Sequence, residues 1–311
     1  MQSILTSCTT SCTAWRNKTP DDRQSAHPYI GLIAWSVIVV FLMIIGLTQP
    51  VQSWADPSIR APQPVPSKQL QIKLDRIVGR HLKKGRSVLA SDQVHIAVID
   101  LGHQNKPFIA LHNGLKRIYP SSVIKIIYMG YIYHLADAGE LVITPSVYRK
   151  LYQMIHPSSN KATAWIVDLW SSTTSNGPMT AHDYKKFAFK RNACNRWLRS
   201  LGIKDIHACQ KTWASPIPPG EEQFLRNGRS SGHYTNRNYM TAKATARYLQ
   251  LIAQDVLVNA KSSEAMRRLM IRDVKKEFAD ELMTNISQIV NPKKIDYVIS
   301  NHTEMDHSGG L

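Results

Sequence analysis

The order of apolar and polar positions predicts a helix and then two strands in the first half of the chain. Apolar residues recur three and four positions apart from Leu70 to Leu82, which predicts an amphipathic helix over residues 69–84. Residues 95–100 and 107–112 have the length and composition of strands. The polar segment between them is short, so the two strands are expected to form a hairpin.

Further apolar segments predict helices, and one long polar segment predicts a loop. The helices are expected over residues 122–138, 158–170 and 241–254. Residues 205–240 are rich in Pro, Gly, Ser and Asn, which favours loop structure over that whole range. No internal repeat is visible in the sequence.

An uncharged apolar stretch near the N-terminus predicts export. Residues 29–47 are dominated by Ile, Val, Leu and Met, basic residues precede them, and Ser53-Trp54-Ala55 follows as a small-x-small pattern. This order is typical of a secretory signal. The stretch is also long enough to span a bilayer of about 30 Å, so an uncleaved anchor in the inner membrane is the alternative. Both interpretations place the protein body outside the membrane, in the periplasm or another extracytoplasmic space.

The sequence divides into four parts. Residues 1–55 hold the signal or anchor, and residues 56–68 contain four prolines that predict an extended linker. Residues 69–273 carry the predicted helices and strands of one large domain. The character of the sequence changes at about residue 274 and stays different to residue 311.

The chain is strongly basic. Lys and Arg number 39 against 22 acidic residues, which gives a net charge of +17. Removal of residues 1–55 would take away three basic and two acidic residues and leave +16. A basic surface suits anionic partners such as cell-wall polymers, but the basic residues are scattered, so an ordinary solvated surface is the alternative. We expect a monomer that does not bind nucleic acid.

Export changes the interpretation of the cysteines. Cys8 and Cys12 precede the apolar stretch, whereas Cys194 and Cys209 lie in the body that would be exported. An oxidising compartment permits a disulfide between the last two. Two unpaired cysteines are the alternative, and the sequence does not decide between them. The four cysteines do not have the spacing of a zinc site.

Ser122 and Lys125 form the candidate catalytic pair. They are three residues apart at the start of a predicted helix, so both side chains lie on one face. A serine hydroxyl is a weak nucleophile and needs a nearby base, which a largely buried lysine can supply when its pKa is lowered. The helix N-terminus adds backbone N–H groups that stabilise a developing oxyanion. An N-cap serine followed by a surface lysine is the alternative interpretation of this tetrad.

Several motifs around this pair resemble the class A β-lactamases and penicillin-binding proteins, whose sites combine S-x-x-K with S-D-N and K-T-G. The resemblance covers about residues 70–273. It rests on the following segments: Tyr119-Pro-Ser-Ser-Val-Ile-Lys125, Ala136-Asp-Ala-Gly-Glu-Leu141, Ser158-Ser159-Asn160 and Asn238-Tyr-Met-Thr-Ala-Lys-Ala-Thr-Ala246.

The resemblance implies a fold and a role for each residue that matches a motif. The fold would be α+β, with a helical subdomain and an antiparallel sheet. Ser122 would be the acylated nucleophile and Lys125 its proton relay. Ser158 would carry protons to the leaving group, and Asn160 would contact the substrate, a β-lactam or a peptidoglycan peptide. Ser158 and Ser159 as loop serines that cap the next helix remain the alternative.

Two departures from the family pattern weaken the expectation of turnover. Members that hydrolyse β-lactams use a glutamate in a long loop to activate water, and here only Glu221 and Glu222 are candidates. No K-T-G or K-S-G follows residue 240, so the sheet is expected to be incomplete at its C-terminal end, with only the first two strands supplied.

The last part of the chain, about residues 274–311, resembles a different family. An apolar strand, Lys294-Ile-Asp-Tyr-Val-Ile-Ser300, leads to the pattern His302-x-Glu304-x-Asp306-His307. This is similar to the metallo-β-lactamase-like domain of flavodiiron proteins. The resemblance implies that His302, Glu304 and Asp306 are iron ligands with His307 beside them, in a site too incomplete to hold two metals. A chimeric origin of this end is the corresponding hypothesis.

Three functions follow from these observations. The first is an exported serine β-lactamase-like hydrolase that needs no cofactor and has an antibiotic-resistance or wall-peptide role. The second is a catalytically inactive, membrane-tethered module that binds the cell wall through its basic body. The third is a fragment of a di-iron flavoprotein.

Overall fold

The computed structural model describes residues 61–83, 90–102, 105–212, 216–229 and 231–271, together with Thr284 and Ser287. Every described residue belongs to one compact unit. The predicted membrane segment, residues 29–47, therefore lies outside the described residues. Among the residues described, no helix is long and apolar enough to cross a bilayer.

The predicted hairpin is present as two strands of a three-stranded sheet. Strands β2 (Ile96–Asp100) and β3 (Phe108–His112) pair antiparallel, from Ile96 opposite His112 to Asp100 opposite Phe108. Strand β1 (Val65–Pro66) adds to the other side of β3 in parallel, which gives the order β1-β3-β2. The expectation of two strands was therefore wrong. The third comes from the predicted linker, where a proline is tolerated because the strand lies at a sheet edge.

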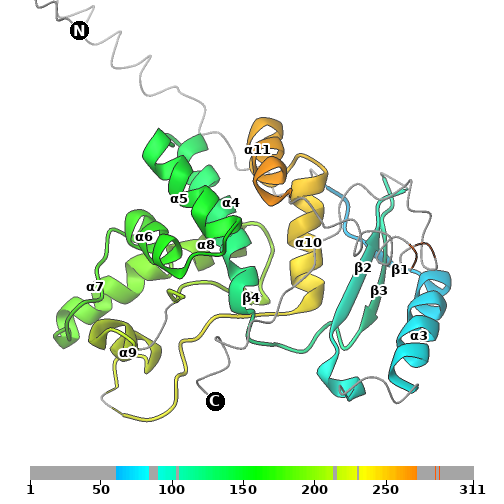
Figure 1. Ribbon diagram of the computed structural model, residues 1–311, viewed down its shortest axis with the longest axis horizontal. Coiled ribbons are helices and arrows are strands. Elements are labelled where there is room, and N and C mark those ends of the chain that lie inside the picture. The colour runs from blue at the N-terminus through cyan, green and yellow to red at the C-terminus, as the bar shows by residue number, and fades with distance from the viewer. Residues whose placement is uncertain are drawn as a thin grey trace, which may run out of the picture. The chain divides into compact units, whose positions relative to one another are not determined.

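Helix α3 (Lys68–Lys83) confirms the first predicted helix and covers one side of this sheet. Its side chains Leu70, Leu74 and Val78 are spaced four apart and form a buried cluster with Ala110 of β3. Helix α10 (Ala242–Ala253), also predicted, approaches the sheet at β2. Figure 1 shows the sheet between α3 and α10.

The larger core is built around α4 (Ile124–Asp137), which is apolar on all sides and almost completely buried. Such a helix must be surrounded by others. It contacts α5 (Pro145–Ile155), α6 (Asn160–Ser171), α8 (Ala193–Ser200) and α11 (Ala260–Met270), as can be followed in Figure 1. The predicted helices over residues 122–138, 158–170 and 241–254 are confirmed to within two residues.

Five of the described α-helices were not predicted, namely α5, α8, α11, α7 (Ala181–Arg191) and α9 (Pro219–Leu225). Three of them begin at a side-chain cap that accepts a hydrogen bond from the backbone of the first turn. The capping residues are Thr144 for α5, Thr180 for α7 and Asn259 for α11. These caps were the sequence signal that would have located the three helix starts.

The loop predicted over residues 205–240 was wrong in part. It contains β4 (Ile206–His207), α9 (Pro219–Leu225) and β5 (Tyr239–Met240), and β4 pairs antiparallel with β5. These elements are too short for a periodic pattern. They are held by tertiary contacts, including a buried ion pair that reaches α9 from α7.

The fold is α+β, as expected, with two small sheets and a larger helical part. The first sheet is mixed rather than purely antiparallel, because β1 runs parallel to β3. Cys194 and Cys209 are both buried and both free, so the disulfide alternative was wrong and the alternative of two unpaired thiols is confirmed.

Candidate active site

Ser122 lies in a single 3-10 turn, Ser121–Val123, that leads directly into α4. Lys125 is in the first turn of α4 and is only 2% exposed. The helical spacing brings the two side chains together, and Lys125 Nζ donates to Ser122 Oγ at 3.1 Å. A surface lysine after an N-cap serine was the alternative, and the burial of Lys125 excludes it.

Residues at the start of α6 complete the cluster. Lys125 Nζ lies 2.8 Å from Ser158 Oγ and 3.0 Å from Asn160 Oδ1, and it also donates to the Ser158 carbonyl at 2.5 Å. Ser158 Oγ donates to Ser122 Oγ at 3.0 Å. Ser122, Lys125 and Ser158 therefore form a closed triangle in which every pair is within hydrogen-bond distance. The four candidate residues therefore meet in one place, although Ser158 and Asn160 follow Lys125 by 33 and 35 positions along the chain.

The side chains of the neighbouring residues Ser158 and Ser159 make different hydrogen bonds. Ser159 is the N-cap of α6, and its side chain accepts a hydrogen bond from Ala162 N at 3.2 Å. The capping alternative is therefore right for Ser159 alone, while Ser158 turns its hydroxyl toward Lys125 and Ser122.

Two residues of this site have left-handed backbone conformations. Ser121 has φ +45° and Ser158 has φ +57°, values that residues other than glycine adopt only at a cost in free energy. Such conformations persist only where the surroundings hold them and are frequent at functional sites. At Ser158 the conformation delivers both its hydroxyl and its carbonyl to Lys125.

The two glutamates considered for water activation are both engaged elsewhere. Glu221 is fully buried and forms a two-pronged ion pair with Arg191, with N–O distances of 2.6 and 2.9 Å. It also accepts from the backbone N–H of Lys211. Glu222 pairs with Arg226 at 2.7 Å, and that hydrogen bond lowers the pKa of its carboxyl. Arg191 was missed in the sequence because a pairing 30 residues apart leaves no local signal.

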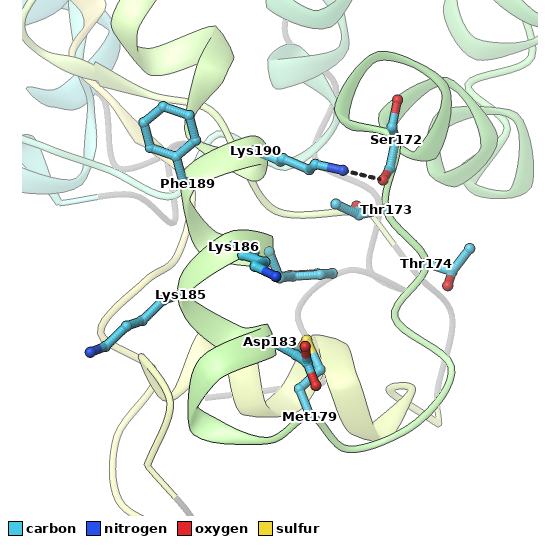
Figure 2. Close-up of a pocket in the computed structure, with 10 residues that line it drawn as sticks. Ser172, Thr173, Thr174, Met179, Asp183, Lys185, Lys186, Phe189 and Lys190 are labelled. Atoms are coloured by element: carbon cyan, nitrogen blue, oxygen red, sulfur yellow. Dashed lines mark hydrogen bonds between the residues drawn. The ribbon is translucent and has the colours of Figure 1, made fainter.

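A separate pocket lies along α7. Its volume is about 590 Å³, and Figure 2 shows that its walls are one side of α7 and the segment that follows α6. Three lysines line it, Lys185, Lys186 and Lys190, together with the exposed ring of Phe189. Lys190 Nζ donates to the Ser172 carbonyl, as the dashed line in Figure 2 marks. None of the four candidate residues of the Ser122 cluster lines this pocket.

The predicted metal ligands His302, Glu304, Asp306 and His307 lie outside the described residues. Within the part of the chain that is described, no three His, Cys, Asp or Glu side chains gather as a metal site would require.

Two curated proteins share a short similarity with the chain. The Flavo-diiron protein FprA2 of Clostridium acetobutylicum is 43% identical over 53 residues, and the Rubredoxin-oxygen oxidoreductase of Megalodesulfovibrio gigas is 40% identical over 53 residues. Each match covers 17% of this chain and 13% of the relative, so the chain spans only a small part of the length of these proteins.

The other comparisons concern most of the described domain. The crystal structure of beta-lactamase from Sphaerobacter thermophilus DSM 20745 matches 63% of this chain and 68% of that one, with 20% identity and a TM-score of 0.42. The Beta-lactamase2 family, described as the Beta-lactamase enzyme family, matches residues 83–291. That range includes Ser122, Lys125, Ser158 and Asn160 and more than half of the chain. The chain is therefore a member of the Beta-lactamase enzyme family, related to the serine β-lactamases and penicillin-binding proteins.

Proposed function

We propose that this protein forms an acyl-enzyme at Ser122 with a β-lactam or a peptidoglycan peptide, outside the cytoplasmic membrane. The observation that carries the proposal is the closed triangle of Ser122 Oγ, Lys125 Nζ and Ser158 Oγ, with sides of 3.1, 2.8 and 3.0 Å. A nucleophile, a base and a second proton carrier within mutual reach are what acyl transfer from an amide requires.

The reaction assigns one proton movement to each side chain. The Ser122 hydroxyl gives its proton to the neutral amine of Lys125 as Oγ bonds to the carbonyl carbon of the substrate. The Ser158 hydroxyl then protonates the leaving nitrogen as the C–N bond breaks, and Lys125 returns a proton to Ser158. With a peptide the products are the Ser122 ester and a free amine, whereas with a β-lactam the amine stays attached to the ester through the opened ring. Asn160, whose Oδ1 accepts from Lys125 at 3.0 Å, holds the lysine in place.

Release of the acyl group is proposed to be slow. Hydrolysis of the ester needs a base that activates water. The ion pairs of Glu221 with Arg191 and of Glu222 with Arg226 engage both carboxylates that the sequence offered for this role. The protein would then behave as a penicillin-binding protein that stays acylated rather than as an efficient β-lactamase.

Export by residues 29–47 belongs to the same proposal, because wall peptides and β-lactams are met outside the membrane. Fractionation of cells that express the full chain, with N-terminal sequencing of the product, tests this part. A cytoplasmic, unprocessed protein would contradict it, and membrane-bound protein with an intact N-terminus would favour the anchor over the signal.

Covalent labelling tests the acylation step. The full chain is incubated with a fluorescent penicillin and the adduct is located by mass spectrometry. We expect one adduct per chain at Ser122, none in Ser122→Ala, and an adduct that persists for minutes or longer. Labelling should be unchanged by EDTA, because no step uses the metal ligands proposed at residues 302–307. Labelling that survives Ser122→Ala would overturn the proposal.

A second candidate function, binding of an anionic cell-wall polymer, is favoured by the lysine-lined pocket on α7. Lys185 and Lys186 are exposed there beside Phe189, which is 65% exposed. Clustered ammonium groups bind polyanions in a salt-dependent way.

Sedimentation with cell-wall preparations tests this second candidate. Lys185→Glu/Lys186→Glu should weaken binding several-fold, while Lys161→Glu/Lys204→Glu changes the net charge equally at exposed lysines outside the pocket. Equal losses in the two double variants would mean that net charge alone matters, and the pocket would then have no specific role.

A further inference from the structure

Helix α3 carries a row of exposed, mostly basic side chains. Lys68, Ile72, Arg76 and Arg80 are spaced four apart, so helical geometry places them along one side of the helix. All four are exposed, as is Lys73 beside them, and Ile72 is 48% exposed. These five residues together form what we call the outer stripe of α3.

The opposite side of the same helix is already engaged. Its buried side chains, Leu70, Leu74 and Val78, lie two positions out of step with the outer stripe, which corresponds to about 200° around the helix axis. They pack on β3, the main neighbour of α3 among the described elements. Figure 1 shows α3 at the margin of the described domain, with the sheet on one side of it. The outer stripe therefore faces away from the core.

The positive charge of the outer stripe is not compensated within the described part of the chain. None of its four basic side chains forms an ion pair with a described acidic residue. Asp75 is the only acidic residue in the helix, and its carboxylate accepts a hydrogen bond from Gln71 Nε2 at 2.8 Å. Four basic groups on about three turns of one helix make a surface suited to an anionic partner.

The exposed isoleucine among these basic groups favours one kind of anionic partner. At the surface of an anionic bilayer, ammonium and guanidinium groups contact lipid phosphates, while aliphatic stems and apolar side chains enter the boundary between headgroups and acyl chains. A solvated polyanion offers the charges but no apolar layer for Ile72. The composition of the outer stripe therefore fits a lipid surface better than a dissolved polymer.

The chain also keeps α3 within reach of a bilayer. Ala61 is 1% exposed, and its carbonyl accepts from Arg247 at 2.7 Å, so the chain is fixed to the domain from this residue onward. Thirteen residues, 48–60, separate it from the proposed membrane segment and can span at most about 50 Å. A tether of this length raises the effective concentration of lipid headgroups around the domain.

From these observations we infer that the outer stripe of α3 is a docking surface for an anionic lipid bilayer. The four basic side chains hold lipid phosphates, and Ile72 inserts between the headgroups. The inference goes beyond acyl transfer, since no residue of the Ser122 cluster takes part in it. The proposed membrane segment serves only as a tether. Docking through α3 holds the domain in one orientation at the membrane surface.

Acetylation of lysines in the full chain, located by mass spectrometry, tests the contact. The chain is mixed with vesicles of phosphatidylglycerol or of phosphatidylcholine before the acetylating reagent is added. Phosphatidylglycerol should slow the acetylation of Lys68 and Lys73 at least about fivefold relative to phosphatidylcholine, which is the effect of one basic residue at an anionic surface. Lys161 and Lys204, which are exposed outside α3, should react equally with both vesicles. Salt at about 1 M should remove most of the protection, because it shortens the screening length to about 3 Å.

Charge reversal provides a matched pair of variants. Arg76→Glu/Arg80→Glu should abolish the protection of Lys68 and Lys73 by phosphatidylglycerol. Reversal at two exposed lysines elsewhere, Lys161→Glu/Lys204→Glu, changes the net charge equally and should leave this protection unchanged.

Three outcomes would overturn the inference, whatever the variants do. The first is equal acetylation of Lys68 and Lys73 with the two kinds of vesicle. The second is equal protection of Lys161 and Lys204, which would mean attraction by net charge alone. The third is protection by an anionic cell-wall preparation but not by phosphatidylglycerol, which would make the partner a polymer. Loss of the tether is seen separately, as failure to sediment with phosphatidylcholine vesicles, and failure of acylation as the absence of a Ser122 adduct.

Discussion

At the scale of single residues, the two neighbouring serines at the start of α6 show how closely a structural and a chemical role can lie together. Ser159 caps the helix through Ala162 N, whereas Ser158 is held in a left-handed conformation that points its hydroxyl at Lys125 and Ser122. The motif S-x-N alone does not indicate which serine caps the helix and which contacts Lys125 and Ser122. The direction of each hydroxyl does.

Separate replacement of each serine by alanine should affect two different properties, acylation for Ser158 and stability for Ser159. Ser158→Ala should slow acylation by a fluorescent penicillin about 100-fold, because a positioned proton carrier contributes at least that much. Its stability should change little. Ser159→Ala should lower the free energy of unfolding by about 1 kcal/mol through loss of the cap, with acylation nearly unchanged. Urea unfolding and the labelling rate together check both. Equal slowing in the two variants would remove the distinction between them.

At the scale of elements, the buried pair of Arg191 and Glu221 joins α7 to α9 and explains why a short helix forms in a segment with loop-like composition. Both side chains are 0% exposed, and Arg191 also donates to the Cys209 carbonyl at 2.8 Å. The rings of Phe187 and Phe224 lie about 5 Å from its guanidinium and shield the pair from water.

Breaking this pair should be costly, since it leaves a buried charge without a partner. Glu221→Gln should lower the free energy of unfolding by about 3–5 kcal/mol. The control is the next residue, because Glu222 forms a partly exposed pair with Arg226, and Glu222→Gln should cost under about 1 kcal/mol. Urea unfolding of the two variants checks the contrast, and similar losses would contradict the structural role given to Glu221.

At the scale of the whole molecule, the larger core keeps several ionisable groups neutral. Cys194 and Cys209 are fully buried, and burial raises the pKa of both thiols, that of Cys209 to about 12. In the unfolded chain a thiol has a pKa near about 8.5. Above that pH the unfolded chain therefore binds fewer protons than the folded chain, and stability must fall as the pH rises.

The urea midpoint should accordingly decline between pH 8 and pH 10. A single thiol contributes up to about 1.4 kcal/mol per pH unit to this slope. Cys209→Ala should be less stable at pH 7 because of the cavity, but its decline between pH 8 and 10 should be shallower. A midpoint independent of pH over this range would show that these thiols are not buried in solution.

The sequence by itself determined six of the described helices and strands and brought forward the candidate catalytic pair. Periodicity placed α3, α4, α6 and α10, and the hairpin composition placed β2 and β3, because these elements bury a face that repeats regularly. The S-x-x-K spacing placed Ser122 and Lys125 on one turn, because helical geometry is local. The motif order then indicated the family, which residues 83–291 match.

Only the tertiary structure decided what depends on residues far apart in the chain. Ser158 joins Lys125 across 33 positions, and Glu221 is engaged by Arg191 across 30, so neither the completed triangle nor the loss of a candidate base could be seen in a local pattern. The third strand and the elements within residues 205–240 were hidden for the same reason. Short elements and single contacts gain their stability from what they pack against, and a linear pattern does not record the partner.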